Sequence, residues 1–95
     1  MFRIDRIYKN TQVELWKFSG RILSSQLTDW EDVLKTLPLG SGHQVILDFC
    51  EIAYLSPEAV GKLIDYITAD TFIANSPTPV KNMIYAAGLS AHVLG

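Results

Sequence analysis

The 95-residue chain has one cysteine, no long apolar run and no cluster of basic residues. Cys50 cannot form an internal disulfide, and a lone thiol is typical of a reducing compartment. No apolar run approaches the ~20 residues of a membrane-spanning helix, so we expect no direct membrane insertion. Eight basic and ten acidic residues give a net charge of −2, which leaves no positive stripe for nucleic acid. No charged-then-apolar leader opens the chain, so we expect a cytoplasmic protein.

Motifs for catalysis and for metal binding are also missing. His43 and His92 have no Cys, His or Asp at ligand spacing, whereas a metal site needs three or four converging ligands. The sequence contains no glycine-rich phosphate cradle, nucleophile elbow or zinc-ligand helix motif. We therefore predict no catalytic residue, no metal and no cofactor, and a protein that is not an enzyme.

What the chain does contain is enough apolar sequence for one domain, residues 1–95, with a single core. The most informative segment is the apolar run 45–50, followed by a short turn and a helix-like pattern up to residue 61. This order is typical of a buried strand that feeds a helix in an α/β sheet. In such sheets, functional sites gather where strand ends meet helix starts.

Hydrophobic spacing and turn residues predict strands at residues 2–9, 12–18, 44–50 and 71–74, with Gly20 closing the second. Helices are expected from Ser24 or Thr28 to residue 37, from Ser56 to residue 67, and from Thr78 to residue 87. The order ββαβαβα implies right-handed crossovers between parallel strands, while the first two strands are close enough to pair antiparallel. We therefore predict an α/β fold in which about three helices pack on a mixed sheet.

Several side chains have specific expected roles in this fold. Thr28 and Glu31 match a capping box, and Ser56 is a good cap because proline follows it. Asp48 would orient a loop amide or pair with Arg21. The residues expected to be buried are Cys50, as a small core hydrophobe, and three helical stripes: Leu27, Trp30, Leu34 and Leu37; Val60, Leu63, Ile64 and Ile67; Val80, Met83, Ile84 and Ala87.

Three landmarks, in this order, resemble the STAS domain of bacterial anti-sigma-factor antagonists, which also occurs on anion transporters and in lipid-transport complexes. Residues 18–22 (FSGRI) resemble the end of the family's second strand and its glycine turn. Residues 45–61 resemble the strand, loop and helix start of the regulatory site. Residues 75–80 and 87–89 resemble the last strand-to-helix turn and the terminal helix. The likeness covers most of the chain from about Val13 onward, and it depends on the order and spacing of these motifs.

The chain departs from the family in the regulatory loop. Antagonists with a phospho-switch carry an Asp-Ser-Ser-Gly-like loop, whose second serine is phosphorylated by the anti-sigma kinase. Here that loop falls at Ser56-Pro57-Glu58-Ala59, so Glu58 stands at the phosphoserine position, and the family's other acidic position falls at Leu23. The resemblance therefore implies no phosphorylation at the family position. Ser56 is an alternative acceptor, although helix capping explains it better. Glu58 either mimics part of a phosphoserine's charge or is only a favourable charge at a helix start.

The chain also looks roughly ten residues shorter than the family between Glu58 and Ser76, which equals about 15 Å of helix. We expect a short second helix, or a fourth strand that is displaced or lost. An exposed neighbouring strand edge would invite pairing with another chain.

These observations favour a regulatory module that binds other proteins at one edge of the sheet. The resemblance implies an anti-sigma factor or a related regulatory kinase as the partner. The alternatives are an accessory subunit of a lipid or anion transport system, docked on its ATPase subunit, and a small-ligand-binding domain. A homodimer is compatible with each of these functions. The expected partner-binding residues are Arg21, Tyr54, Leu55, Ser56, Glu58, Asn75 and Thr78.

Overall fold

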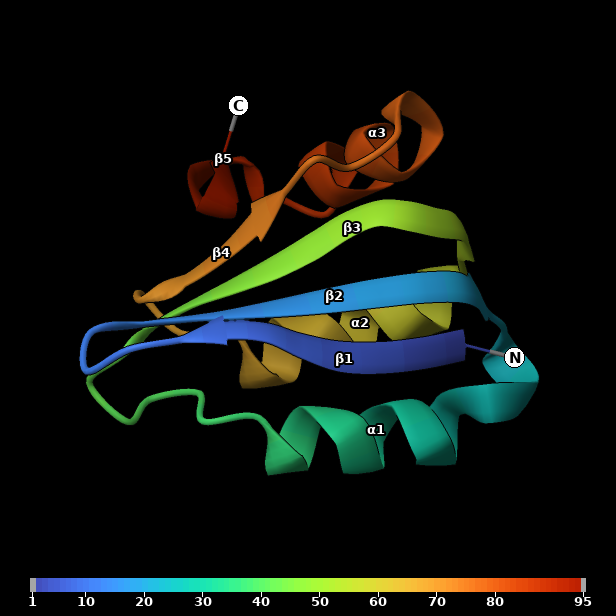
Figure 1. Cartoon of the computed structure of the whole chain (residues 1–95). Coiled ribbons are helices and arrows are strands. Elements are labelled where there is room, and N and C mark those ends of the chain that lie inside the picture. Colours follow the sequence, from blue (N-terminus) through green and yellow to red (C-terminus); the bar gives the residue numbers. More distant parts are fainter. Residues whose placement is uncertain (1, 95) are drawn as a thin grey trace.

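Alternating apolar residues build one sheet in the computed structural model, which describes residues 2–94. Its strands lie in the order β1-β2-β3-β4-β5, so the apolar run from the middle of the chain occupies the centre (Figure 1). β1 and β2 are antiparallel, and every later pair is parallel, which confirms the predicted mixed sheet. The bounds are β1 (Phe2–Lys9), β2 (Val13–Ile22), β3 (Gln44–Leu55), β4 (Thr71–Ala74) and β5 (Val93–Leu94). Only β5, two residues long, was not predicted.

Three helices connect the parallel strands, as predicted, and they all contribute side chains to one core on one face of the sheet. Figure 1 looks onto the opposite face, and among residues 2–94 no helix crosses in front of the strands. No helix within these residues is long and apolar enough to cross a membrane. The helices are α1 (Leu27–Thr36), α2 (Pro57–Tyr66) and α3 (Thr78–Ala86), with short 3-10 turns at Ser24–Gln26 and Ser90–His92.

The core is centred on Trp30, which is fully buried under the sheet. Its ring meets Phe2 and Phe18 edge-on, with centroid separations of 5.8 and 5.6 Å. Its indole N–H donates a hydrogen bond of 2.9 Å to the carbonyl of Ala59, which ties α1 to α2. The apolar stripes predicted for the three helices are confirmed except at Ile64, which is 43% exposed. Ile64 lies about 100° round α2 from the buried Leu63, because each helical residue turns by that amount.

Both central strands are longer than the sequence suggested. β2 continues through Gly20 to Ile22, and β3 continues through the expected turn to Leu55. Two register shifts between these strands make this possible, and Gly20 sits between them with a φ of 97° that favours glycine.

The prediction that Cys50 is a core residue is wrong, because its thiol lies on the exposed side of β3. Phe49 points into the core, so the next residue along the strand points outward. Asp48, on the same outward side, uses its Oδ1 to accept a hydrogen bond of 2.9 Å from the backbone N–H of Cys50. Of the two roles considered for Asp48, orienting a nearby amide is the one observed.

The predicted capping box at Thr28 does not form. A 3-10 turn at Ser24–Gln26 begins the helical path earlier, so α1 starts at Leu27 and Thr28 lies inside it. The side chain of Gln26 instead accepts a hydrogen bond of 3.1 Å from the N–H of Leu23. The start of α2 is as predicted, since the Ser56 hydroxyl accepts a hydrogen bond of 3.1 Å from the N–H of Ala59.

Between Glu58 and Ser76 the chain forms a short helix, α2, and a fourth strand that is kept but brief. β4 pairs with β3 only along Val45–Asp48, so residues 49–55 of β3 have no strand partner on that side. The carboxyl end of β3 therefore extends well beyond β4 (Figure 1).

Candidate protein-interaction edge

The carboxyl ends of β2 and β3 bring Arg21 and Tyr54 side by side. The two residues are register partners, and the guanidinium carbon of Arg21 lies 6.0 Å from the centre of the Tyr54 ring. Tyr54 is 39% exposed, which is unusual for a large aromatic side chain in a strand. A guanidinium over an aromatic ring presents a flat surface with charge and apolar area together. Both residue types are enriched at the centres of protein interfaces.

Leu55 and Ser56 support this edge from inside and do not form its surface. Leu55 is fully buried in the core and Ser56 is 2% exposed. The N–H of Ser56 donates to the carbonyl of Ile22 at 2.9 Å, which fixes the end of β3 to the end of β2. The prediction that Leu55 contacts a partner directly is therefore wrong, because the side chain anchors β3 from below.

Glu58 lies in the first turn of α2, two residues after the cap, and its side chain is exposed. A carboxylate at this position interacts favourably with the positive end of the helix dipole. Because α2 starts directly after β3, Glu58 is only four residues along the chain from Tyr54. An exposed carboxylate therefore follows the exposed Tyr54 closely in the sequence.

Asn75 does not reach the Arg21–Tyr54 pair. It follows Ala74, which pairs with Asp48, six residues before Tyr54 on the same strand. Asn75 is exposed and adopts a φ of 60°, as a tight turn out of β4 requires. Thr78 is exposed at the start of α3, beyond this turn. The structure therefore brings together two of the predicted side chains, Arg21 and Tyr54, and separates Asn75 from them.

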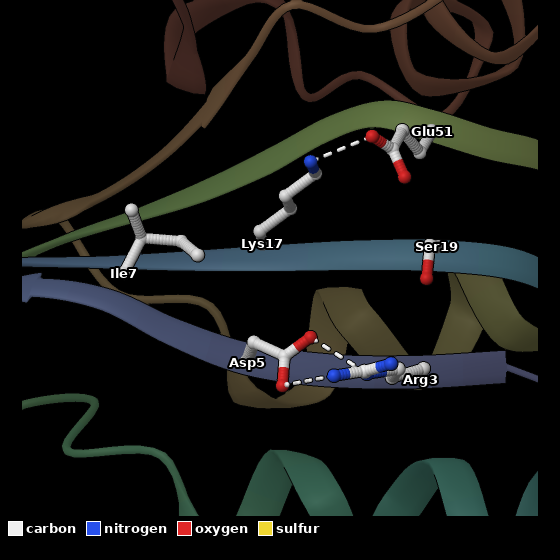
Figure 2. Close-up of a pocket in the computed structure, with 6 residues that line it drawn as sticks. All are labelled: Arg3, Asp5, Ile7, Lys17, Ser19 and Glu51. Carbon is white, nitrogen blue, oxygen red and sulfur yellow. Dashed lines mark hydrogen bonds and ion pairs between the residues drawn. The ribbon is translucent and has the colours of Figure 1, made fainter.

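A shallow depression of about 420 Å³ lies elsewhere, on the face of the sheet without helices (Figure 2). Two ion pairs cross it: Arg3 Nε to Asp5 Oδ2 at 2.8 Å, and Lys17 Nζ to Glu51 Oε2 at 2.6 Å. The hydrogen bond and the charge of Glu51 raise the pKa of Lys17. Each of these charges is matched within the protein and at least partly exposed, so no unmatched polar group among them points to a ligand. Sequence reasoning missed this group because its members come from three strands.

Neither histidine takes part in a cluster of ligating residues. Nδ1 of His43 lies 3.0 Å from the Ser41 hydroxyl, and Nδ1 of His92 lies 2.9 Å from the carbonyl of Thr71. Within residues 2–94, no group of three or more His, Cys, Asp or Glu side chains converges in a way that could hold a metal ion.

Comparison with solved structures identifies the architecture. The anti-sigma factor antagonist SpoIIAA in its unphosphorylated form matches with a TM-score of 0.70, over 99% of this chain and 86% of that one. The chain has the STAS fold. The phosphorylated form of the Bacillus cell fate determinant SpoIIAA matches with a TM-score of 0.65, over 99% of this chain and 89% of that one. Identities are only 13% and 11%, so the STAS likeness lies in the fold. No protein-family model and no curated protein sequence matches the chain.

Proposed function

We propose that this STAS domain is a non-enzymatic regulatory module that binds a protein partner through Arg21, Tyr54 and Glu58. The observation that carries the proposal is the exposed Arg21–Tyr54 pair at the carboxyl edge of a sheet with the fold of an anti-sigma factor antagonist. An anti-sigma factor or a related regulatory kinase is the partner class that fits this fold.

The module works without a serine phospho-switch. The resemblance to the family puts Glu58 at the position of the phosphorylated serine, and a carboxylate is no phosphoryl acceptor for a serine kinase. The only hydroxyl in the loop belongs to Ser56, which is 2% exposed and already accepts the Ala59 N–H. A kinase could reach Ser56 only after the start of α2 had opened. Glu58 would then supply a constant negative charge at the start of α2.

The test is affinity capture from the native cell, quantified by mass spectrometry, with tagged wild type, Tyr54→Ala and Arg21→Ala. Tyr85→Ala is a matched control, because Tyr85 is 45% exposed and pairs with Lys81 at 5.8 Å on α3, away from this edge. We expect the two edge variants to lose a regulatory partner that wild type and Tyr85→Ala retain. Glu58→Ser and Glu58→Lys, run in parallel, measure the contribution of the acidic position.

Equal recovery of every partner by Tyr54→Ala, Arg21→Ala and the control would remove this edge from the recognition surface. Recovery of a transporter ATPase as the edge-dependent partner would replace the proposed class with the transport alternative. Phosphate found on Ser56, accompanied by loss of the partner, would overturn the absence of a switch.

A further inference from the structure

The open face of the sheet carries an apolar row that crosses four strands. Tyr8 is the register partner of Leu15, Leu15 of Ile46, and Ile46 of Phe72, so the four side chains lie on one line. None of them belongs to the core or packs against it, whereas on β2, β3 and β4 a sequence neighbour of each one does: Trp16, Val45, Leu47 and Ile73. Alternation in these three strands therefore places Leu15, Ile46 and Phe72 on the face that Figure 1 presents to the viewer. Tyr8 follows a register shift in β1 and joins this face as the register partner of Leu15.

This pattern is typical of a sheet that other structural elements cover on both faces. Parallel strands with apolar residues on both faces are normally buried on both faces. Here Val45 and Leu47 are buried on the helix side while Ile46 points to the open side. Tyr8, at one end of the row, is 52% exposed, and Ile7 beside it is 55% exposed. Apolar surface gathered in this way marks an interaction site.

A second row carries charged residues, and it lies two residues further along β2, β3 and β4 and three residues away on β1, where the register shifts. There Asp5 is the register partner of Lys17, Lys17 of Asp48, and Asp48 of Ala74. Lys17 and Asp48 thus stand on either side of the boundary between β2 and β3. A two-fold axis along the strands above this boundary exchanges β2 with β3, so it places each Lys17 opposite Asp48 of a second copy.

The same axis places Leu15 opposite Ile46, and Tyr8 opposite Phe72, of the second copy. Apolar residues then meet apolar residues. Lys17, which pairs with Glu51 of its own copy at 2.6 Å, also meets the Asp48 carboxylate of the other copy, and this happens at two symmetric places. The two sheets would pack face to face, about 10 Å apart, with their helices on the outside. We propose that the open face binds a second copy of this chain and forms a two-fold symmetric dimer.

The size of the face sets the strength of this dimer. Four strands at about 4.8 Å spacing and about eight residues at 3.3 Å cover roughly 500 Å² on each copy, or roughly 1,000 Å² in total. That area is at the low end of specific interfaces, so we expect a dimer that dissociates on dilution in the micromolar range. An axis along the strands leaves both Arg21–Tyr54 edges at the same end of the dimer. A dimeric or repeated partner would bind two such edges more tightly than one.

Sedimentation velocity of the full chain over a dilution series tests the dimer. We expect wild type to self-associate, and Tyr8→Lys and Lys17→Asp each to weaken association by about tenfold or more, because they set a charge against an apolar or a like-charged group. The double variant Lys17→Asp with Asp48→Lys restores the opposite charges, and it should recover most of the association. Circular dichroism and thermal melting confirm that each variant is folded.

Tyr85→Lys is the matched control for Tyr8→Lys, since Tyr85 is also about half-exposed but lies on α3. It should leave association unchanged. A wild-type chain that stays monomeric at the highest concentration overturns the proposal. A dimer that is insensitive to Tyr8→Lys and Lys17→Asp also overturns it, since another surface would then hold the copies. Neither result bears on the edge at Tyr54, which is tested by partner capture.

Discussion

The two faces of the sheet use the same strands in opposite ways. On the helix face, Phe18 and Phe49 meet edge-on at 5.4 Å and are fully buried under the helices. On the open face, residues of the same two strands, Lys17 and Glu51, form an exposed ion pair. The strand backbone is shared, so the difference lies only in which side chain each pleat directs outward.

The helix face therefore stabilises the fold, whereas the open face and the Arg21–Tyr54 edge leave side chains available for binding. Buried apolar contacts stabilise a small domain by far more than exposed ion pairs, which contribute about 0–1 kcal/mol each. The open face and the Arg21–Tyr54 edge are therefore able to change without loss of the fold. Chains that share only about one residue in eight with SpoIIAA can keep the same architecture for this reason.

The largest expected effect comes from breaking the helix face at Trp30. Trp30→Ala removes the ring that packs against Phe2 and Phe18, and it removes the indole N–H that the buried carbonyl of Ala59 accepts. We expect a loss of about 3–5 kcal/mol in the free energy of unfolding, measured by urea denaturation. Phe72→Ala removes an aromatic residue from the open face, and we expect a loss of only about 1 kcal/mol. Equal losses at the two positions would contradict the distinction between the faces.

The sequence predicted the helix face better than the open face. Stripes such as Trp30, Leu34 and Leu37 repeat at helical spacing, and this periodicity is a direct consequence of burial on one side. The resemblance to the STAS domain was also recoverable, because the order of strand, glycine turn and capped helix is local in sequence. Cys50 was misplaced because an apolar run hides which of its residues point outward.

The candidate site was recovered only in part, since its geometry depends on strand register. Arg21 and Tyr54 are 33 residues apart, and two register shifts between β2 and β3 set them side by side. Bulges of this kind leave no clear pattern in a single sequence. Asn75 was expected at the same edge because parallel strands were assumed to end together. β4 is shorter than β3 and ends at Ala74, which pairs with Asp48.

A second, smaller effect is expected at the helix cap beneath the interaction edge. Ser56→Ala removes the acceptor of the Ala59 N–H in a buried setting, and we expect a loss of about 1 kcal/mol. Thr78→Ala is the control, because the N-cap of α3 is Pro77 and no side chain caps that helix. Thermal unfolding should show a lower midpoint for Ser56→Ala and little change for Thr78→Ala. A larger fall in the unfolding midpoint for Thr78→Ala would contradict the structure, in which the Ser56 side chain caps α2 and no side chain caps α3.

On the helix side, the contact between α1 and α2 gives a pH dependence. The Tyr66 hydroxyl donates a hydrogen bond of 2.8 Å to Glu31 Oε2, and Lys62 Nζ lies 3.5 Å from the same oxygen. The hydrogen bond from Tyr66 is the largest cause that lowers the pKa of Glu31, and the same bond raises the pKa of Tyr66.

The sign of each shift fixes the pH window. Because folding lowers the pKa of Glu31, its ionised carboxylate stabilises the fold above pH ~4.3, the ordinary pKa of glutamate. This stabilisation is lost as the pH falls through the pKa of Glu31 in the folded protein. Because folding raises the pKa of Tyr66, its protonated hydroxyl stabilises the fold below pH ~10, the ordinary pKa of tyrosine. This stabilisation is lost as the pH rises through the pKa of Tyr66 in the folded protein. The difference in stability between wild type and Tyr66→Phe should therefore be largest near neutral pH and shrink on both sides. Denaturation across this range measures it, and a difference independent of pH would contradict the assignment.

The smallest expected effect concerns reactivity on the open face. Cys50 is exposed, so a maleimide should label it in the folded protein without denaturant. Its pKa is raised, chiefly by a side-chain hydrogen bond with Asp48 and then by partial burial, so little thiolate is present at neutral pH. Asp48→Asn should therefore speed labelling by several-fold, because the nearby negative charge is gone. Labelling that requires unfolding would place Cys50 on the helix face after all. An unchanged rate in Asp48→Asn would show that Asp48 does not control the thiol, and would leave the outward direction of Cys50 intact.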